Sequence, residues 1–449
     1  MLTDLARLYA VVAWFVVTAL ALLTPPFQVP DEQQHFFRAY QISELHVRSV
    51  AQDGQTGAVL PASLIELSAD FLGSRSFHAK PPMRAIPLRE TAALLARPLD
   101  PGRREFIGFT GAAAYWPGAY LPQAAAIGVG RAAGLGPLGL LYAARLLNGW
   151  IAVALIAAAL RLLPSGRRAV FVVGLLPMTL YEIASCSADA TTIGTALLFT
   201  ALATRALALG RWTPRAILAA TAAALVFCPL KPVYAPMLLL AFPLGRGRTP
   251  ARAVVAQAII LAVALGGAVA WLAASPVEAA APFPGVDPAS QLRFFAAHPF
   301  HFPHMLVVTT EIYGRQWAEQ VIGVLGWLSV PLPWPMLVLP AAALTACALL
   351  PRLQPWRPDW VRAGWFVALI CASFALVLLA LALLWSPVGA LVVEGAQGRY
   401  LLPLAGVAAV VIEGAWPLLS SALARKVAIL AITEAALTIV LVVRAFQVF

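Results

Sequence analysis

Charged residues are scarce in this sequence. Of its 449 residues only 11% are charged, 61% are hydrophobic, and the mean hydropathy is +0.83. A soluble domain is nearer a quarter charged and under half apolar, so a chain this apolar could not cover its surface in water. The composition therefore excludes a soluble enzyme, a secreted disulfide scaffold and a disordered chain. It predicts an integral membrane protein.

Paired cysteines and nucleotide-binding motifs are also missing. The four cysteines stand singly along the chain, which gives no support to a disulfide framework or a zinc ribbon. There is no Gly-rich phosphate loop, GxSxG, HExxH or Rossmann fingerprint. These absences argue against nucleotide hydrolysis on the cytoplasmic side.

The apolar runs that are present predict an all-α polytopic membrane protein with about 11 transmembrane helices. The long first loop between them is polar and proline-rich, is expected extracytoplasmic, and carries a helix near 115–133 lying in the outer leaflet. The run at 216–244 is interrupted around Lys231, and such half-helices survive only where protein or a cavity covers them. The predicted parts are a first helix (1–24), the loop with juxtamembrane helices (25–137), a transmembrane core (138–274), a second loop with a re-entrant segment (275–334) and C-terminal helices (335–449).

The distribution of basic residues predicts the orientation. With the N-terminus in the cytoplasm, the predicted cytoplasmic connections carry many arginines, against Asp4 and Asp359, as the positive-inside rule requires. The net charge of +11 is then a topology signal and gives no support for nucleic-acid binding. Polar side chains, including all the histidines, gather on the extracytoplasmic side.

The first candidate cluster directly follows the first apolar run. Asp31 and Glu32 precede His35 and Arg38. If this segment is helical, Asp31, His35 and Arg38 share one face, because they stand at i, i+4 and i+7. A carboxylate at a helix N-terminus is stabilised as the ion, ready to accept a proton or to orient a hydroxyl. The alternative is that the two acids only cap the helix.

Two more acids, Glu182 and Asp189, flank a short polar segment where two predicted spans meet at the outer surface. Ionisable groups at membrane depth are costly and often mark a polar cavity. In the structural alternative, Asp189 caps the span that follows it and Glu182 pairs with Arg145.

Two cations complete the candidate set. Lys231, the only lysine between Lys80 and Lys426, stands between two half-helices, where an ammonium can hold a phosphate as a point charge. The alternative for Lys231 is snorkelling to lipid headgroups. Arg399, followed by Tyr400, can clamp phosphate oxygens with two donors, or can act as an interfacial anchor.

Three histidines in the second loop form a weaker signal. His298, His301 and His304 are spaced by three, but the prolines between them spoil a regular helix. No cysteine is near, so zinc ligation has little support and the function of this cluster stays open.

These residues resemble a known pattern. Its elements in this chain, Asp31-Glu32, Tyr115-Trp116-Pro117, Ala144-Arg145-Leu146, Asp189 and Lys231-Pro232, look like those of GT-C membrane glycosyltransferases that use lipid-linked sugars. An even closer resemblance is to the bacterial domain-of-unknown-function family 2142. It rests on the sequence segments PDEQQHFFRAYQIS, GVLGWLSVPLP and QGRYLLP.

The resemblance implies a polyprenyl-phosphate sugar as donor and transfer, with inversion, to a glycan, lipid or protein acceptor on the outer face of the cytoplasmic membrane. Asp31 would be the general base, with Glu32 as second choice. Lys231 and Arg399 would hold the lipid phosphate, with Arg38 in reserve. No cofactor is expected; a divalent metal is conceivable but has no support. The remaining substrate-binding candidates are His35, Tyr115, Glu182, Asp189 and Tyr400.

Other functions stay open at this stage. One is a transporter or flippase of lipid-linked glycans, although such proteins tend to show internal repeats and midplane charges, and this chain shows neither. Another is a glycan polymerase or ligase that uses a lipid diphosphate donor. The sequence specifies neither the sugar nor the acceptor.

Overall fold

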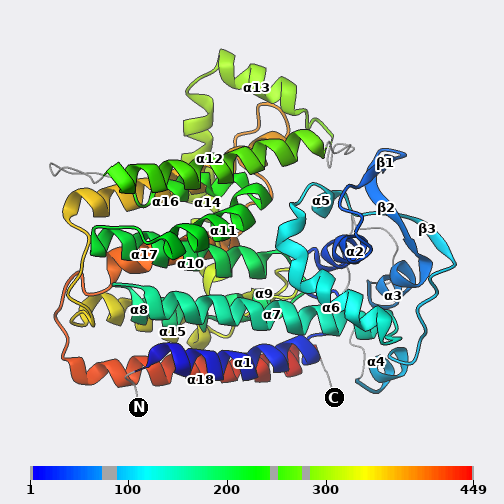
Figure 1. Ribbon diagram of the computed structural model, residues 1–449, viewed down its shortest axis with the longest axis horizontal. Coiled ribbons are helices and arrows are strands. Elements are labelled where there is room, and N and C mark those ends of the chain that lie inside the picture. The colour runs from blue at the N-terminus through cyan, green and yellow to red at the C-terminus, as the bar shows by residue number, and fades with distance from the viewer. Residues whose placement is uncertain (1–3, 73–87, 243–250, 276–283, 447–449) are drawn as a thin grey trace.

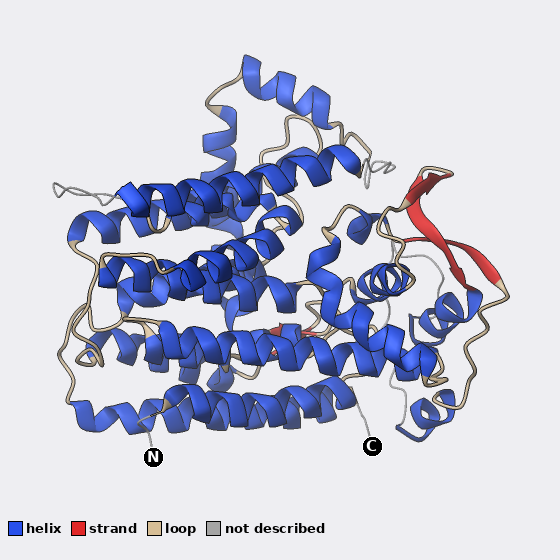
Figure 2. Ribbon diagram, viewed as in Figure 1, coloured by secondary structure: helices blue, strands red, loops and turns tan. Residues whose placement is uncertain are grey.

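The structure is a computed structural model that describes residues 4–72, 88–242, 251–275 and 284–446. Most of these residues are helical (Figure 2). The long helices lie side by side in a bundle, with a helical projection on one side (Figure 1). At one end of the bundle is a lobe formed by residues 32–72 and 88–132, which we call the polar lobe.

Six of the described helical segments are long and apolar enough to cross a membrane. They are α1 (Leu5–Leu23), α7 (Pro137–Leu162), α10 (Asp189–Leu209), α12 (Ala251–Ala274), α16 (Trp360–Leu384) and α18 (Ala424–Ala445) with the short helix η4 (Ser421–Leu423) before it. Several apolar helices of this length fit a multi-pass membrane protein.

The other predicted spans are helical but short or broken. Three shorter apolar segments are α11 (Pro214–Leu230), α15 (Trp334–Leu349) and the pair η3 (Gly398–Leu404) and α17 (Ala405–Ile412). The remaining two runs form α8 (Arg167–Gly174) with α9 (Pro177–Ile183), and the 3-10 helix η2 (Pro232–Leu239). Length and composition therefore support six spans, and the predicted count of about 11 is not established.

The bundle is layered in a simple order. Helix α18 packs beside α1, α1 beside α7, α7 beside α10, and α10 beside α11, which in turn contacts α12 (Figure 1). Small residues permit this close packing: a Cβ on Gly149 of α7 would lie 2.5 Å from Cγ1 of Val17 on α1. The tight packing fixes the helix ends that carry the site.

The polar lobe extends beyond the C-terminal end of α1. It contains a three-stranded antiparallel sheet, which corrects the all-α prediction. The turn between the first two strands is Asp53-Gly54, both at positive φ, a two-residue hairpin connection that the flanking residues extend into strands. The elements are α2 (Glu32–Ser43), β1 (Val50–Gln52), β2 (Gln55–Pro61), α3 (Ala62–Leu72), α4 (Leu88–Leu94), β3 (Arg104–Gly108), α5 (Thr110–Ala113), η1 (Pro117–Tyr120) and α6 (Leu121–Ala132).

Two segments that were predicted to lie at the membrane interface have structures that differ in detail from the prediction. The helix expected at 115–133 begins only at Pro117, as the 3-10 turn η1 that leads into α6, and α6 packs on α2 and α7. The projection is α13 (Pro288–Ala297) with the start of α14 (His301–Ile322), whose later part packs on η3 in the bundle. The segment predicted as re-entrant contains a small hairpin, β4 (Val324–Leu325) and β5 (Val330–Pro331), and the Trp327 indole between the two strands donates to the carbonyl of Phe27 at 2.9 Å.

Basic side chains gather at the end of the bundle opposite the polar lobe. Arg168 pairs with Glu413 at 3.6 Å, and Arg167 lies within electrostatic range of Arg205 and Asp4. Connections predicted as cytoplasmic from different parts of the chain therefore meet at one end. Glu413, which directly follows α17, belongs to this basic end.

Candidate functional site

Asp31 stands at the junction of α1 with the polar lobe, in a conformation that few side chains adopt. Its φ is 63° and its ψ 4°, in the left-handed region, which is unfavourable for residues other than glycine, although aspartate enters it more readily than most. Asp31 therefore precedes α2 instead of belonging to it, and its carboxylate makes no capping hydrogen bond. This corrects both the predicted shared face with His35 and Arg38 and the capping alternative. Strain of this kind is often retained at functional sites.

Arg399 in η3 is the centre of a network of charges. Its guanidinium lies 3.3 Å from a carboxylate oxygen of Asp31, 3.1 Å from Glu182 and 3.7 Å from Asp189. Its Nε donates to Gln397 at 2.7 Å. The network thus joins the start of α2, α9, α10 and η3. Glu182 pairs here, and not with Arg145 as the structural alternative had it.

Lys231 supplies the second cation. Helix α11 ends at Leu230, and η2 begins at Pro232, so the predicted break falls at Lys231. The ammonium of Lys231 donates to Asp189, which is also the acid that faces Arg399. Asp189 is the first residue of α10 but not its cap, because Ala188 holds that position.

The five charged side chains form a gradient of exposure. The side chain of Asp31 is 47% exposed, those of Lys231 and Asp189 are 15% and 12%, and those of Arg399 and Glu182 only 4% and 1%. Asp31 is therefore the group that meets a ligand from solvent first. Glu182 and Arg399 form the floor beneath it.

Two tyrosines border Lys231. Its ammonium lies 5.4 Å from the ring centre of Tyr400 and 6.0 Å from that of Tyr115, within the range of cation–π attraction. The guanidinium of Arg399 lies 5.6 Å from the same Tyr400 ring. Of the two predicted tyrosines, Tyr400 thus neighbours both cations and Tyr115 neighbours Lys231.

His35 lies below this surface on α2. Its Nδ1 is 2.7 Å from the hydroxyl of Tyr120, and its ring stacks on Tyr115 with centres 5.8 Å apart. Burial lowers the pKa of His35 to about 4, against the opposing influence of Asp189 and Asp31. His35 is therefore neutral at physiological pH and positions Tyr115 without adding charge.

Glu32 is placed quite differently from its neighbour Asp31. It is fully buried and accepts from Arg145 at 2.7 Å, from the backbone N–H of Cys186 at 2.9 Å and from that of Phe27 at 3.0 Å. Arg145 also donates to the carbonyls of residues 21, 24 and 25 at the end of α1. With its oxygens engaged and no access to solvent, Glu32 cannot serve as the second-choice base and instead holds α1, α2 and α7 together.

Arg38 is also engaged. Its guanidinium donates to Gln41, Ser49 and the carbonyls of Val47 and Tyr115, and the residue has no exposed surface. It fastens the lobe around α2 and is not available to hold a phosphate. This removes the reserve role predicted for it.

The histidine cluster lies apart from the network, on the projection. His298 stacks on Phe294 with ring centres 4.4 Å apart, and Nε2 of His301 lies 2.9 Å from the carbonyl of Ala390. Within the described residues, no group of three or more His, Cys, Asp or Glu side chains is placed to hold a metal ion.

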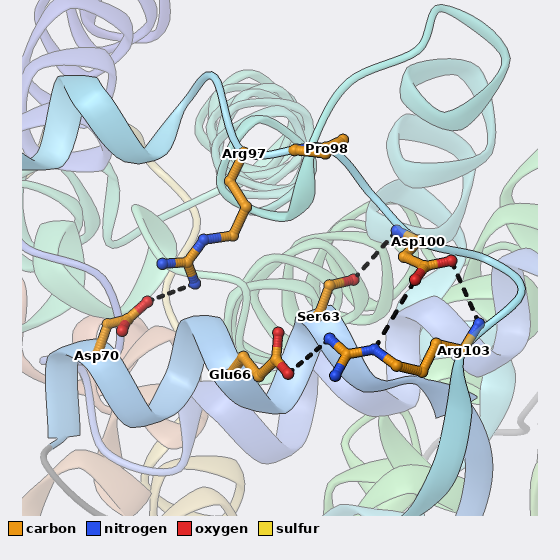
Figure 3. A pocket seen from close by; sticks show the side chains of 7 residues that line it. All are labelled: Ser63, Glu66, Asp70, Arg97, Pro98, Asp100 and Arg103. Atoms are coloured by element: carbon orange, nitrogen blue, oxygen red, sulfur yellow. Dashed lines mark hydrogen bonds and ion pairs between the residues drawn. The ribbon is translucent and has the colours of Figure 1, made fainter.

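A cavity of about 570 Å³ opens in the polar lobe, between α3 and the connection that leads to β3 (Figure 3). Its charged groups are used in ion pairs: Arg97 with Asp70 at 2.6 Å, and Arg103 with Glu66 at 2.6 Å. These pairs fasten the connection to α3. We therefore assign the charged residues of this cavity a structural role within the lobe, separate from the Arg399 network.

A comparison with known protein families identifies the family of this chain. A model of the DUF2142 family, described as predicted membrane proteins, matches residues 14–408. The chain belongs to the DUF2142 family. No curated protein and no solved structure shows a match. All five charged members of the network lie inside the matched DUF2142 region, which ends before α18.

Proposed function

We propose that this DUF2142 protein is a GT-C type glycosyltransferase that moves a sugar from a polyprenyl phosphate to a hydroxyl acceptor on the outer face of the cytoplasmic membrane. The observation that carries the proposal is Asp31: a strained, half-exposed carboxylate held 3.3 Å from an arginine in a network with a second cation. Base and phosphate-binding charges stand together at one end of a bundle of apolar helices.

The proposed reaction needs these groups. Asp31 takes the proton of the acceptor hydroxyl while that oxygen attacks the anomeric carbon from the face opposite the phosphate. The bond from the anomeric carbon to the phosphate oxygen breaks, and its electron pair leaves with the lipid phosphate. The configuration of the sugar is therefore inverted. The leaving group is a stable anion that requires positive charge and no proton, and Lys231 and Arg399 supply that charge.

The orientation follows from the two ends of the bundle. Basic side chains such as Arg167, Arg168 and Arg205 gather opposite the polar lobe, and positive residues favour the cytoplasmic side. The N-terminus would then be cytoplasmic, and Asp31 would face the outside of the inner membrane of a bacterium. Lipid-linked sugar would reach the network from the outer leaflet.

A transfer assay with matched variants tests the proposal. Wild type, Asp31→Asn and Asp53→Asn are purified in detergent and given radiolabelled polyprenyl-phosphate sugars with a crude cell-envelope acceptor. Asp53 is the matched control, because it too has a positive φ, at 51°, but stands in the β1–β2 turn.

We expect wild type and Asp53→Asn to release label from the lipid, and Asp31→Asn to release it about 10²- to 10⁴-fold more slowly, the usual contribution of a general base. Equal release by Asp31→Asn would move the base to another residue. If wild type released no label from any donor of the panel, the transferase proposal would fail, and transport of lipid-linked glycans would be assayed instead.

A further inference from the structure

Glu182 is the least exposed member of the network. Its side chain is 1% exposed, its Oε1 accepts from Arg399 at 3.1 Å, and its Oε2 has no hydrogen-bond partner among the residues that the structure describes. Asp189, by contrast, faces both Lys231 and Arg399, and Asp31 is half exposed to water. Among the three acids, Glu182 therefore depends most on a single arginine.

The charged groups around Glu182 are carried by several different elements of the structure. Arg399 reaches it from η3, Asp189 from α10 and Lys231 from the end of α11. Asp31 engages Arg399 from the start of α2. Arg145 on α7 is occupied by Glu32, and His35 is neutral near pH 7 because of its burial. No other cation of this group is free to replace Arg399 beside Glu182.

The sum of these charges sets a constraint on any anionic ligand. When all five groups are ionised, Asp31, Glu182 and Asp189 contribute three negative charges, and Lys231 and Arg399 two positive ones, which leaves a net charge of −1. A lipid phosphodiester adds another negative charge. If it takes donors from Arg399, Glu182 is left as a buried carboxylate without compensation, and such a group neutralises itself by binding a proton.

We infer that Glu182 takes up one proton from solvent when the phosphate of the donor lipid binds between Lys231 and Arg399. The proton restores the net charge of −1 and frees the guanidinium of Arg399 to turn from the acids to the phosphate. Donor binding is thereby coupled to pH, and Asp31 is released from Arg399 at the moment its carboxylate is needed. This inference rests on the proposed function, since it assumes a lipid-phosphate ligand.

The test is a binding measurement that does not depend on the sugar. The probe is a polyprenyl methyl phosphate, a phosphodiester with one charge and no titration near neutral pH. Calorimetry in two buffers of different ionisation enthalpy counts the protons taken up per ligand bound. The proteins are wild type, Glu182→Gln and, as a matched control, Glu434→Gln, which changes another buried glutamate far along the chain on α18.

Wild type and Glu434→Gln should take up about one proton per ligand at pH 8, and their Kd should rise about tenfold per pH unit above neutrality, as linkage of one proton requires. Glu182→Gln should bind the probe with no proton uptake and a Kd that is flat with pH. Binding by wild type without proton uptake, or uptake that survives in Glu182→Gln, would overturn the inference while leaving the proposed function intact. Failure of wild type to bind the probe at all would count against the lipid-phosphate site itself.

Discussion

Two adjacent residues, Asp31 and Glu32, lie in opposite surroundings. Glu32 is fully buried, and its two oxygens accept from Arg145 and from backbone N–H groups. Asp31 is half exposed, sits at positive φ and shares Arg399 with two other acids. The Glu32–Arg145 pair is closed, in that both side chains are buried and paired with each other. The Asp31–Arg399 pair belongs to an open network, in that Arg399 is shared with other acids and Asp31 is exposed to solvent.

The difference separates scaffold from site. A buried pair whose donors and acceptors are all satisfied gains nothing from a ligand and loses much when one partner is removed. A network with more acids than cations, open on one side and strained at its edge, can exchange its internal contacts for contacts with a ligand. The Glu32–Arg145 pair fixes the backbone on both sides of Asp31, and so keeps Asp31 in its strained conformation.

The largest effect is expected where the closed pair is broken. Glu32→Gln leaves the guanidinium of Arg145 buried without its counter-charge, and we expect a loss of about 3–5 kcal/mol in the free energy of unfolding. Thermal unfolding in detergent and the yield of folded protein measure it. The double variant Glu32→Leu/Arg145→Met removes the uncompensated charge but also the hydrogen bonds to five backbone groups, so it should regain only part of this stability. Normal stability of Glu32→Gln would show that the pair is no scaffold.

A smaller effect, on activity and not on stability, is expected in the open network. Lys231→Met keeps the length of the side chain and removes its charge, so transfer should slow about 10²-fold, comparable to the loss of one oxyanion donor. Label release from a polyprenyl-phosphate sugar measures it. Lys426→Met, an exposed lysine on α18, is the control. Equal rates for the two variants would remove Lys231 from the site.

The pH dependence of stability sharpens the comparison at His35. Because burial lowers its pKa to about 4, the unfolded chain binds a proton at this position more readily than the folded one. Its contribution to stability is complete above the unfolded pKa of about 6.5 and is lost as the pH falls toward 4, by roughly 2 kcal/mol at pH 5. Unfolding measured at pH 7.5 and pH 5 should show a smaller difference in His35→Gln than in wild type. An equal difference would mean that the pKa of His35 is the same in the folded and the unfolded chain.

The smallest effect is expected at the cavity of the polar lobe. Glu66 pairs with Arg103 at 2.6 Å, but both side chains are well exposed, at 37% and 59%. Glu66→Gln should therefore change the free energy of unfolding by no more than about 1 kcal/mol. It makes the same chemical change as Glu32→Gln, so thermal unfolding of the two variants compares an exposed pair with a buried one. A large loss in Glu66→Gln would give the cavity a larger structural role.

The sequence predicted the helices and the break at Lys231 because these depend on local features. Apolar runs specify helices in a membrane, and Pro229 and Pro232 bracket the break. It also selected Asp31, Asp189, Lys231 and Arg399, since charges are rare enough in this chain for each to stand out. The sheet built on the hairpin at Asp53-Gly54 was not predicted.

The pairing of charges could not be predicted in the same way. Arg145 in an apolar span requires an acid, and both Glu32 and Glu182 were available, but only packing decides that Glu32 is the partner. The spacing of Asp31, His35 and Arg38 indicated one helical face, whereas the positive φ of Asp31 removes it from the helix. Tyr120 and Gln397, which support His35 and Arg399, carry no signal in the sequence beyond their proximity to predicted residues.

The central claim, that Asp31 is kept in a strained conformation for chemistry, is tested most directly by Asp31→Gly with Asp53→Gly as control. Glycine adopts positive φ without strain, so both variants should unfold at the wild-type temperature or slightly above it. Label release in the transfer assay should be retained by Asp53→Gly and lost by Asp31→Gly. Full transfer activity in Asp31→Gly would contradict the account, because a site that works without the carboxylate has no need of it as a base.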